Sequence, residues 1–278
     1  MISGRTGILG VIGHPVTHSG SPAMHNAALA ATGLDYVYAA FAVAPEGAPA
    51  VGQAMRTLNI TGLNVTVPHK QAVMEFLDEV TPEATAIGAV NTIHHLDGRL
   101  IGHNTDGYGI RASLREDGGL QQLPPRVVLL GAGGAARAIL HALLAAPEVE
   151  QGVLLNRTVE RAEALAADLA GGSRVIVGSM ADTGAVAHAG LLINSTSIGM
   201  EPAADQSPLG DGSCLHDGLV VVDIVYKPLQ TQLLQQALAA GARSVDGLGM
   251  LAHQGARAFE IWTGVAPPVA VMRRALQP

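Results

Sequence analysis

Residues 126–140 read RVVLLGAGGAARAIL, which predicts a buried strand, a glycine-rich turn and a helix. Residues 127–130 form a short apolar run, typical of a strand covered on both faces. Gly131, Gly133 and Ala136 follow as G-x-G-x-x-A. In this setting the first glycine permits a tight turn, the second lets a pyrophosphate approach the backbone, and the small third residue lets the helix pack on the strand. The stretch predicts a dinucleotide site; an ordinary α/β turn is the alternative, because the chain has 34 glycines.

Composition limits the possible classes of protein. The chain has 278 residues, of which 48% are hydrophobic and 14% charged, so it can form one large folded domain or two ordinary ones. The net charge of −7 without a basic run argues against nucleic-acid binding. Apolar runs are too short for a membrane helix or a signal peptide, and the single cysteine and scattered histidines give neither a disulfide framework nor a metal site. We therefore expect a cytoplasmic enzyme without a metal.

Alternating patterns in the first hundred residues predict one α/β unit that ends near residue 104. Asp97-Gly98 between two apolar runs is a strong hairpin signal. The expected strands are residues 6–12, 36–42 and 62–67 and the two arms of the hairpin, and the expected helices are residues 23–32 and 46–58.

Polar residues follow these elements where open α/β sheets bind ligands. Ser21, before Pro22, is expected to cap the helix; Ser19 and Ser21, spaced two apart, could instead both point toward a bound polyol. Lys70, one of only two lysines among 16 basic residues, is expected to open the helix after strand 62–67. A surface lysine is the alternative. Asp106 is expected to cap the helix that follows it.

The second unit contains the residues that select the cofactor. Its expected strand 153–155 ends in Asn156-Arg157-Thr158, where an NAD enzyme usually has an acidic residue for the ribose 2′-hydroxyl. Here Arg157 and Arg161 lie one helical turn apart, and Thr158 is expected to cap the helix, which favours a 2′-phosphate and hence NADP. A solvated helix start with Arg161 paired to a glutamate is the alternative. Further strands are expected at residues 174–177, 191–194 and 219–225, and helices at residues 231–240, after Asp246 and at residues 269–276.

Taken together, the motifs resemble the shikimate dehydrogenase family from end to end, in the family's order. The matching segments are Gly13–Asn26 (G-x-P-V-x-H-S-x-S-P-x-x-H-N), Asn64–Lys70 (N-V-T-V-P-x-K), Gly88–Thr92 (G-A-V-N-T), Gly102–Gly107 (G-x-N-T-D-G), Gly131–Arg137 (G-A-G-G-A-A-R), Asn156–Thr158 (N-R-T) and Asp246–Gln254 (D-G-L-G-M-L-x-x-Q).

The resemblance implies a two-domain α/β fold with a cleft between the domains. An N-terminal α/β substrate domain would cover residues 1–104 and be completed by C-terminal helices in residues 247–278. A doubly wound Rossmann domain for NADP would cover residues 105–246. The implied activity is the reversible NADP-dependent reduction of 3-dehydroshikimate to shikimate, in chorismate and aromatic amino-acid biosynthesis. The implied assembly is a monomer or a homodimer, with this small molecule as its partner.

The resemblance also assigns roles to residues of this chain. Lys70 and Asp106 would be the catalytic pair, and Ser19 and Ser21 would bind the substrate carboxylate. The other implied substrate ligands are Asn64, Thr66, Asn91, Tyr226 and Gln254. The implied cofactor ligands are Gly131, Gly133, Gly134, Ala135, Asn156, Arg157, Thr158, Arg161, Asn194, Ser195, Thr196, Gly247 and Met250.

Three rival interpretations differ from this one. Related branches of the family oxidise quinate or an aminated analogue, often with NAD and an acidic residue near the position of Arg157. A methylenetetrahydrofolate dehydrogenase-like enzyme shares the two-domain plan and a lysine, but a folate would favour an aromatic-lined cleft and only 3% of the residues are aromatic. A non-catalytic NADP-binding regulator should have lost Lys70 or Asp106, and both are present.

Overall fold

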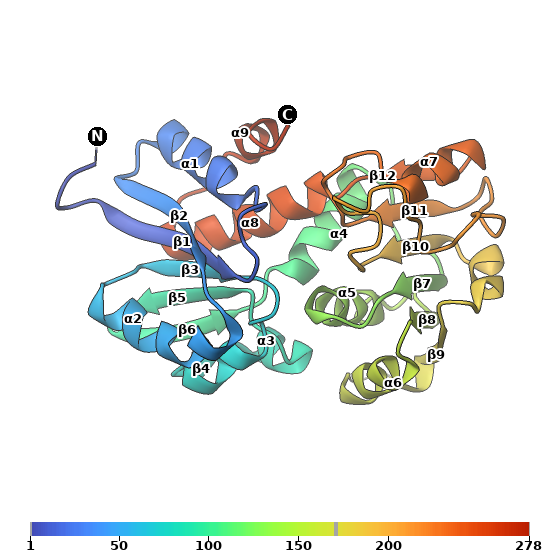
Figure 1. Ribbon diagram of the computed structural model, residues 1–278, viewed down its shortest axis with the longest axis horizontal. Coiled ribbons are helices and arrows are strands. Elements are labelled where there is room, and N and C mark those ends of the chain that lie inside the picture. Colours follow the sequence, from blue (N-terminus) through green and yellow to red (C-terminus); the bar gives the residue numbers. More distant parts are fainter. Residues whose placement is uncertain (1, 170–171, 278) are drawn as a thin grey trace. The chain divides into compact units, whose positions relative to one another are not determined.

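The computed structural model describes residues 2–169 and 172–277, and the chain forms two compact units (Figure 1). Unit 1 comprises residues 1–109 and 252–278, and unit 2 comprises residues 110–251. The sequence placed the boundaries in the loops at residues 104 and 246. The division between the compact units lies a few residues later in each case, inside helices α4 (Asp106–Glu116) and α8 (Leu248–Thr263). Asp106 therefore belongs to unit 1.

Unit 1 is built on a mixed sheet with the strand order β2-β1-β3-β5-β6-β4. β1 pairs in parallel with β2 and β3, and the hairpin β5–β6 joins antiparallel to β3. The strands are β1 (Gly7–Gly13), β2 (Tyr36–Ala42), β3 (Gly62–Val65), β4 (Glu79–Val80), β5 (Thr92–Leu96) and β6 (Arg99–His103). The helices are α1 (Ser21–Thr32), η1 (Pro45–Ala50), α2 (Val51–Thr57), η2 (Ala72–Phe76), α3 (Pro82–Ile87) and α9 (Val269–Arg274), together with the ends of α4 and α8 that lie in this unit.

Alternation along β1 separates the two cores of unit 1. Leu9 and Val11 face a core that they share with α1, α8 and α9, whereas Ile12 faces a core that it shares with α2, α3 and the hairpin strands. A period of two residues is what a strand covered on both faces requires. The hairpin turns at Asp97 (φ 49°) and Gly98 (φ 78°), so the expected hairpin is confirmed, with both turn residues in the positive-φ region that tight hairpins use.

Unit 2 is a doubly wound parallel sheet with the order β12-β11-β10-β7-β8-β9, which is the Rossmann order. Its strands are β7 (Arg126–Leu130), β8 (Gln151–Asn156), β9 (Val175–Ser179), β10 (Leu191–Asn194), β11 (Val220–Asp223) and β12 (Arg243–Val245). Its helices are α5 (Gly134–Leu144), α6 (Val159–Asp168), η3 (Gly172–Arg174), η4 (Thr183–His188) and α7 (Gln232–Ala239).

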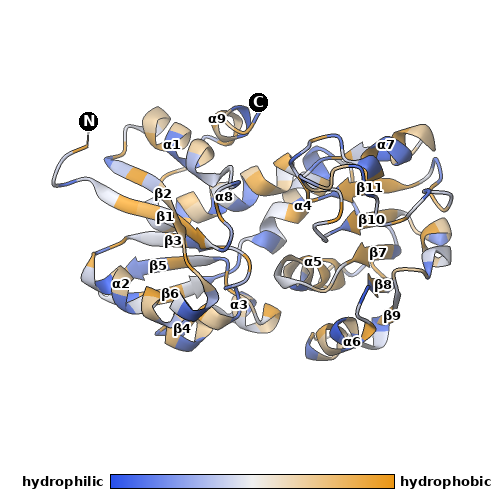
Figure 2. Ribbon diagram, in the orientation of Figure 1, coloured by the Kyte–Doolittle hydropathy of each residue, from blue (hydrophilic) through white to orange (hydrophobic). Residues whose placement is uncertain are grey.

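The central strands of unit 2 are apolar except at one end, and Figure 2 shows the apolar residues of β7, β10 and β11. Val127 and Leu129 pack against α5, while Val128 and Leu130 pack on the opposite face with α7 and η4. The strand–turn–helix expected from residues 126–140 is confirmed, with β7 ending at Leu130 and α5 beginning at Gly134. In the described part of the chain, no helix is both long and apolar enough to cross a bilayer.

Four predictions about where helices begin or how far they extend were wrong. The helix expected over residues 46–58 is divided into η1 and α2, with Pro49 near the junction. Lys70 lies in a turn, and η2 begins only at Ala72. Ser21 is the first residue of α1 and not its cap. Asp106 is likewise the first residue of α4, and the Asn104 side chain accepts its backbone N–H (Oδ1···N 3.0 Å).

A buried histidine on α1 predicts a pH dependence of the stability. His25 is 0% exposed and stacks on Tyr38, with ring centroids 4.3 Å apart. Burial lowers the pKa of His25 from 6.5 to about 3, since it penalises the imidazolium. Between these two pH values only the unfolded chain takes up a proton at this residue, so stability is lost as the pH falls below 6.5. His25→Phe removes this loss.

Urea unfolding at pH 7 and pH 5 measures this contribution. Lowering the pH from 7 to 5 should reduce the free energy of unfolding of wild type by about 2 kcal/mol more than that of His25→Phe. A difference that stays constant over this interval would mean that His25 titrates alike in the folded and unfolded chain.

Candidate active site

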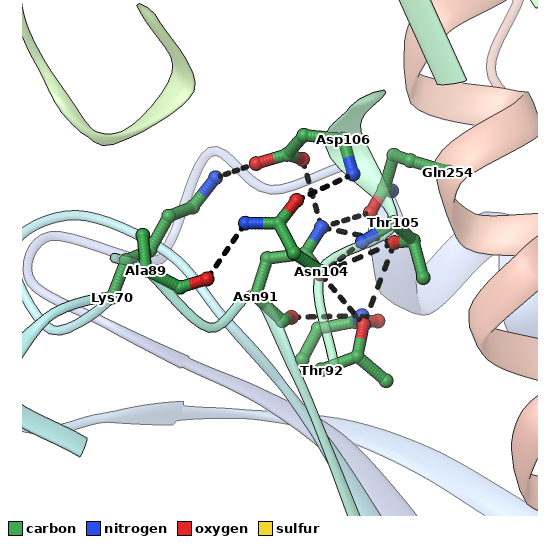
Figure 3. Close-up of polar contacts among 9 residues, drawn as sticks. Lys70, Ala89, Asn91, Thr92, Asn104, Thr105, Asp106 and Gln254 are labelled. Atoms are coloured by element: carbon green, nitrogen blue, oxygen red, sulfur yellow. Dashed lines mark hydrogen bonds and ion pairs between the residues drawn. The ribbon is translucent and has the colours of Figure 1, made fainter. Parts of the chain in front are cut away.

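An ion pair that is largely shielded from solvent joins Lys70 to Asp106 in unit 1. The Lys70 Nζ lies 2.5 Å from the Asp106 Oδ2, and the two side chains are 12% and 6% exposed. Figure 3 shows the lysine reaching from the turn after β3 toward the first residue of α4. The sequence placed these residues 36 positions apart, and the sheet brings them together. The pair places an ammonium beside a carboxylate at the edge where β3 ends.

Asn91 fixes the carboxylate of this pair. Its Nδ2 donates to the Asp106 Oδ1 at 2.8 Å, so each carboxylate oxygen has its own donor. Its Oδ1 accepts the Thr105 N–H at 2.8 Å, which permits only one orientation of the amide. Asn91 is 2% exposed, and a buried amide with partners on both ends resists rotation. Asp106 is thus held between a lysine and an asparagine.

The hydrogen-bond network continues from Asn91 to a second asparagine. Thr92 Oγ1 donates to the Asn91 Oδ1 at 3.0 Å and accepts from the Asn64 Nδ2 at 3.1 Å. The other donor of Asn64 points to the Asn91 backbone carbonyl (3.3 Å), and its Oδ1 accepts the Tyr38 hydroxyl at 2.7 Å. Both amide hydrogens of Asn64 are therefore used within the protein, and a lone pair of Oδ1 is what it can still offer to a ligand.

The two serines at the start of α1 differ from the expectation that Ser21 caps the helix. The Ser19 Oγ accepts the backbone N–H of Ser21 at 3.2 Å, so Ser19 binds the first turn of α1 and Ser21 does not cap it. Ser19 is half-buried and retains its hydroxyl proton as a donor. Ser21 is 6% exposed, and its side chain forms a hydrogen bond with Tyr38. Burial raises the pKa of the Tyr38 hydroxyl well above 10.

Thr66 and Gln254 belong to different elements of unit 1 and have different contacts. Thr66 follows β3, and its methyl group packs on Gly13, where a Cβ would lie only 2.4 Å from the Thr66 Cγ2. Gln254 lies on α8, and its Oε1 accepts a long hydrogen bond of 3.4 Å from the Asn91 Nδ2. Tyr226 belongs to unit 2, where it follows β11 and is half-buried.

Sequence reasoning missed four supporting residues of this site. Asn104, Thr105 and Thr92 lie inside motifs that it quoted, but a motif does not tell a ligand from a residue that holds one. Tyr38 carried no signal, because an aromatic residue in an alternating strand is ordinary core. Only the pairing of β1 with β2 and β3 brings the Tyr38 hydroxyl to Asn64.

Unit 2 presents an open glycine turn at the start of α5. Gly131 has φ +102°, and a Cβ there would approach the Ser195 Oγ to 2.9 Å. A Cβ on Gly133 would meet no described atom within 4 Å, so the backbone there can be approached closely. No side chain among the described residues caps the first turn of α5, which leaves the N–H groups of Gly134 and Ala135 for a ligand. The turn fits the phosphates of a dinucleotide.

The start of α6 lies at the end of β8. Arg157 and Arg161 are exposed, and within the described ranges neither has an ion-pair partner within 4 Å, unlike the salt-bridged alternative. Thr158 occupies the cap position, but its side chain makes no cap hydrogen bond to a described residue, contrary to expectation. The Asn156 Nδ2 donates to the Thr158 carbonyl at 2.7 Å and shapes the turn. Two exposed guanidiniums and a hydroxyl suit a phosphate.

The remaining predicted cofactor residues fall into two groups. Asn194 is the last residue of β10, which lies beside β7 in the sheet, and Ser195 and Thr196, which follow it, pack against Gly131. Gly247 and Met250 are buried, and the contacts that the structure shows for them are packing contacts: a Cβ on Gly247 would lie 2.5 Å from the Ile224 carbonyl, and Met250 packs in the core with 6% exposure. For these two residues, packing alone explains the residue type.

Three family models match this chain. Residues 11–93 match the shikimate dehydrogenase substrate binding domain, residues 119–226 match shikimate / quinate 5-dehydrogenase, and residues 247–277 match the shikimate 5′-dehydrogenase C-terminal domain. The three matches cover most of the chain and fall in the order that the motifs predicted.

Relatives and solved structures agree along the whole length. A shikimate dehydrogenase (NADP(+)) of Symbiobacterium thermophilum is 50% identical over 275 residues, covering 96% of this chain and 92% of the relative. A crystal structure of a shikimate dehydrogenase in complex with NADP+ has a TM-score of 0.92 at 45% identity, covering 99% of this chain and 96% of the other. The shikimate 5-dehydrogenase of Thermus thermophilus, in complex with NADP(H) and shikimate, has a TM-score of 0.88 at 40% identity and covers 98% of both chains. The family matches and the full-length relatives confirm the resemblance that the motifs predicted, and this chain belongs to the shikimate dehydrogenase family.

Proposed function

We propose that this protein catalyses the reversible NADPH-dependent reduction of 3-dehydroshikimate to shikimate, with Lys70 and Asp106 as its acid–base pair. The buried contact between the Lys70 Nζ and the Asp106 Oδ2 carries the proposal. It puts a group able to give and take a proton next to a fixed carboxylate, as reduction of a carbonyl requires. The family match and the relatives named for this activity support the substrate.

The chemistry of the reaction divides between the cofactor and the protein. When bound, NADPH supplies the hydride that the carbonyl carbon receives. Lys70 donates a proton to the carbonyl oxygen as that oxygen becomes an alcohol, and in the reverse direction the neutral amine takes the proton back. Asp106 keeps the Nζ in place through its Oδ2, while Asn91 holds the other carboxylate oxygen.

The substrate carboxylate binds to the two serines at the start of α1. Ser19 donates its hydroxyl proton to the carboxylate while its oxygen still accepts the Ser21 N–H. Ser21 turns its hydroxyl from Tyr38 to the carboxylate. Asn64 accepts a ring hydroxyl through the remaining lone pair of its Oδ1, and Thr66, Asn91, Gln254 and Tyr226 complete the substrate contacts. A polyhydroxylated acid thus meets both donors and acceptors.

NADP binds to unit 2 along the edge where β7, β8 and β10 end. The Gly131–Gly133 turn and the uncapped N-terminus of α5 hold the pyrophosphate. Arg157 and Arg161, with Asn156 and Thr158, hold the 2′-phosphate that distinguishes NADP from NAD. Asn194, Ser195 and Thr196 contact the cofactor beside the glycine turn, and Gly247 and Met250 contribute from the start of α8.

The proposal is tested by following reduced-nicotinamide absorbance with shikimate or quinate and with NADP+ or NAD+. Wild type should be most efficient with shikimate and NADP+. Lys70→Ala should lower turnover by about 10²–10⁴-fold, because a positioned acid–base group is lost, and should leave the Kd for NADP+ unchanged. Lys227→Ala, which removes the other lysine, is the matched control and should keep its turnover. Retention of more than about half of the turnover in Lys70→Ala would show that the assigned chemistry is wrong.

The carboxylate site is tested with Ser19→Ala. Loss of this hydroxyl should weaken shikimate binding by roughly 1–3 kcal/mol, because the carboxylate loses a donor. Because Ser19 also holds the Ser21 N–H, a stability loss of up to about 1 kcal/mol is expected, so the affinity and the melting temperature are measured together. Ser207→Ala, which removes a hydroxyl bonded to Gln236 in unit 2, controls for the stability effect. Equal shikimate affinity in wild type and Ser19→Ala would return Ser19 to a purely structural role.

Cofactor choice is tested with Arg157→Asp. The change removes one guanidinium from the 2′-phosphate and places a carboxylate there, which repels NADP and offers an acceptor to the 2′-hydroxyl of NAD. The ratio of kcat/KM with NADP+ to that with NAD+ should fall by at least about 10-fold, which takes about 1.4 kcal/mol. Arg161 remains, so activity with NAD+ need not rise equally. A native preference for NAD+, or an unchanged ratio, would contradict the role given to residues 156–161 but not that of Lys70.

A further inference from the structure

Asp223 is a buried acid that the proposed mechanism does not use. It is the last residue of β11 and is 0% exposed. Its Oδ1 accepts from the Asn194 Nδ2 and from the Val225 N–H, both at 3.0 Å, and its Oδ2 accepts from the Thr231 Oγ1 at 2.7 Å. A buried carboxylate costs free energy unless hydrogen bonds compensate it, and here three donors converge on it. The hydrogen bonds of Asp223 therefore lead to the residues that its carboxylate holds in place.

The carboxylate determines the orientation of Asn194. In the β10–β11 register Asn194 pairs with Asp223, so the two side chains meet at the ends of neighbouring strands. Burial raises the pKa of Asp223 to about 6, and near neutral pH the carboxylate is an acceptor only. The Asn194 Nδ2 must therefore face Asp223, and the Asn194 Oδ1 must face the other way. The amide cannot flip without placing two acceptors against each other.

The fixed Oδ1 of Asn194 organises the next turn of the chain. It accepts the Thr196 N–H at 3.0 Å and the Thr196 Oγ1 at 2.7 Å. The Thr196 Oγ1 in turn accepts the Ile198 N–H at 3.1 Å, so the hydroxyl is bonded on both sides. Between them, Ser195 binds the Leu130 carbonyl with its N–H at 2.9 Å and its Oγ at 2.6 Å. The turn at residues 194–196 is thus tied to the end of β7.

This turn forms one wall of the glycine fingerprint. A Cβ on Gly131 would lie 2.9 Å from the Ser195 Oγ and 3.0 Å from the Thr196 Cγ2. Gly131 begins the open turn that leads to α5, so a displacement of Ser195 or Thr196 would move into the space that the pyrophosphate needs. The hydrogen bonds therefore lead from a buried acid to the surface of the candidate cofactor site.

We propose that Asp223 is a positioning residue for NADP: through the Asn194 amide it holds the turn at residues 194–196 against Gly131 and so keeps the cofactor site in its binding shape. The proposal rests on the proposed function in assuming that NADP binds at this turn. Asp223 acts through Asn194, which lies between it and the turn.

Binding of NADP+ to the full chain, measured by calorimetry, tests this role. Asp223→Ala should raise the Kd for NADP+ about 10-fold and leave the Kd for shikimate, which binds to unit 1, within about 2-fold of wild type. Asp223→Asn keeps an oxygen acceptor at the same place and should restore the affinity to within about 3-fold of wild type. In an Asn194→Ala background, Asp223→Ala should have no further effect on the Kd, because the residue through which it acts is gone.

Thr231→Val separates positioning from stability. It removes another hydrogen bond of Asp223 and the side-chain cap of α7, so the melting temperature should fall while the Kd for NADP+ stays within about 2-fold of wild type. A loss of NADP+ affinity in Asp223→Ala that is matched in Thr231→Val, or that persists in the Asn194→Ala background, would overturn the proposal.

Two further outcomes remain decisive. If Asp223→Ala does not fold, Thr196→Val takes its place: it removes the hydroxyl bonded to Asn194 but keeps the shape of the side chain, and an unchanged Kd for NADP+ would contradict the proposed chain of contacts. A wild-type protein that binds shikimate but not NADP+ would overturn the proposed function and the inference together, whereas wild-type binding that Asp223→Ala leaves intact overturns the inference alone.

Discussion

A single asparagine amide, that of Asn91, holds together the polar centre of unit 1. Its two hydrogens and its oxygen bind Asp106, Thr105 and Thr92, and these residues come from α4, the loop before it and β5. A buried amide left unpaired would cost roughly 1–3 kcal/mol at each end, so the partners must fold together or not at all. This constraint places the carboxylate of Asp106 with far more precision than a surface ion pair would have. Lys70 then needs only one contact to be placed as well.

The two units use the same device with opposite surroundings. In each, a buried aspartate at the end of a strand or helix is bound by an asparagine: Asp106 by Asn91, which precedes β5, and Asp223 by Asn194, which ends β10. In unit 1 the second carboxylate oxygen meets a lysine; in unit 2 it meets the hydroxyl of Thr231. In the proposed function the first arrangement serves proton transfer, because the lysine that shares the carboxylate can donate a proton. The second arrangement has a hydroxyl in place of that cation, and what it can fix is the shape of a turn.

Much of this could be predicted from sequence because the decisive signals are local. The apolar run before Gly131, the Asp97-Gly98 hairpin and the alternation of strands and helices each follow from a few neighbouring residues. The cap predicted at Ser21 was wrong because α1 starts at Ser21 itself, which makes Gly20 the N-cap, and the Ser19 hydroxyl accepts the Ser21 N–H. The prediction that Lys70 begins a helix was wrong because Lys70 lies in a turn whose conformation depends on a distant residue. The backbone N–H of Val90 donates to the Lys70 carbonyl, and helix propensity carries no information about this contact. Tyr38 and Asp223 could not be found, since their partners lie 26 and 29 residues away in sequence.

The chain has only two lysines, and one of them, Lys70, pairs with Asp106 at the candidate site. Fourteen of the 16 basic residues are arginines, yet the cation buried against Asp106 is a lysine. An arginine there would make a stronger, bidentate ion pair with the carboxylate, and stability alone would favour it. A guanidinium, however, keeps its protons at any physiological pH, whereas an ammonium can release one to a developing alkoxide. At residues 157 and 161 a fixed charge suffices for the proposed phosphate contact, and there the chain has arginine. An arginine at residue 70 would bind the carbonyl oxygen of a substrate but would not protonate it. In the proposed mechanism, the need to move a proton therefore explains why residue 70 is a lysine although the rest of the chain favours arginine.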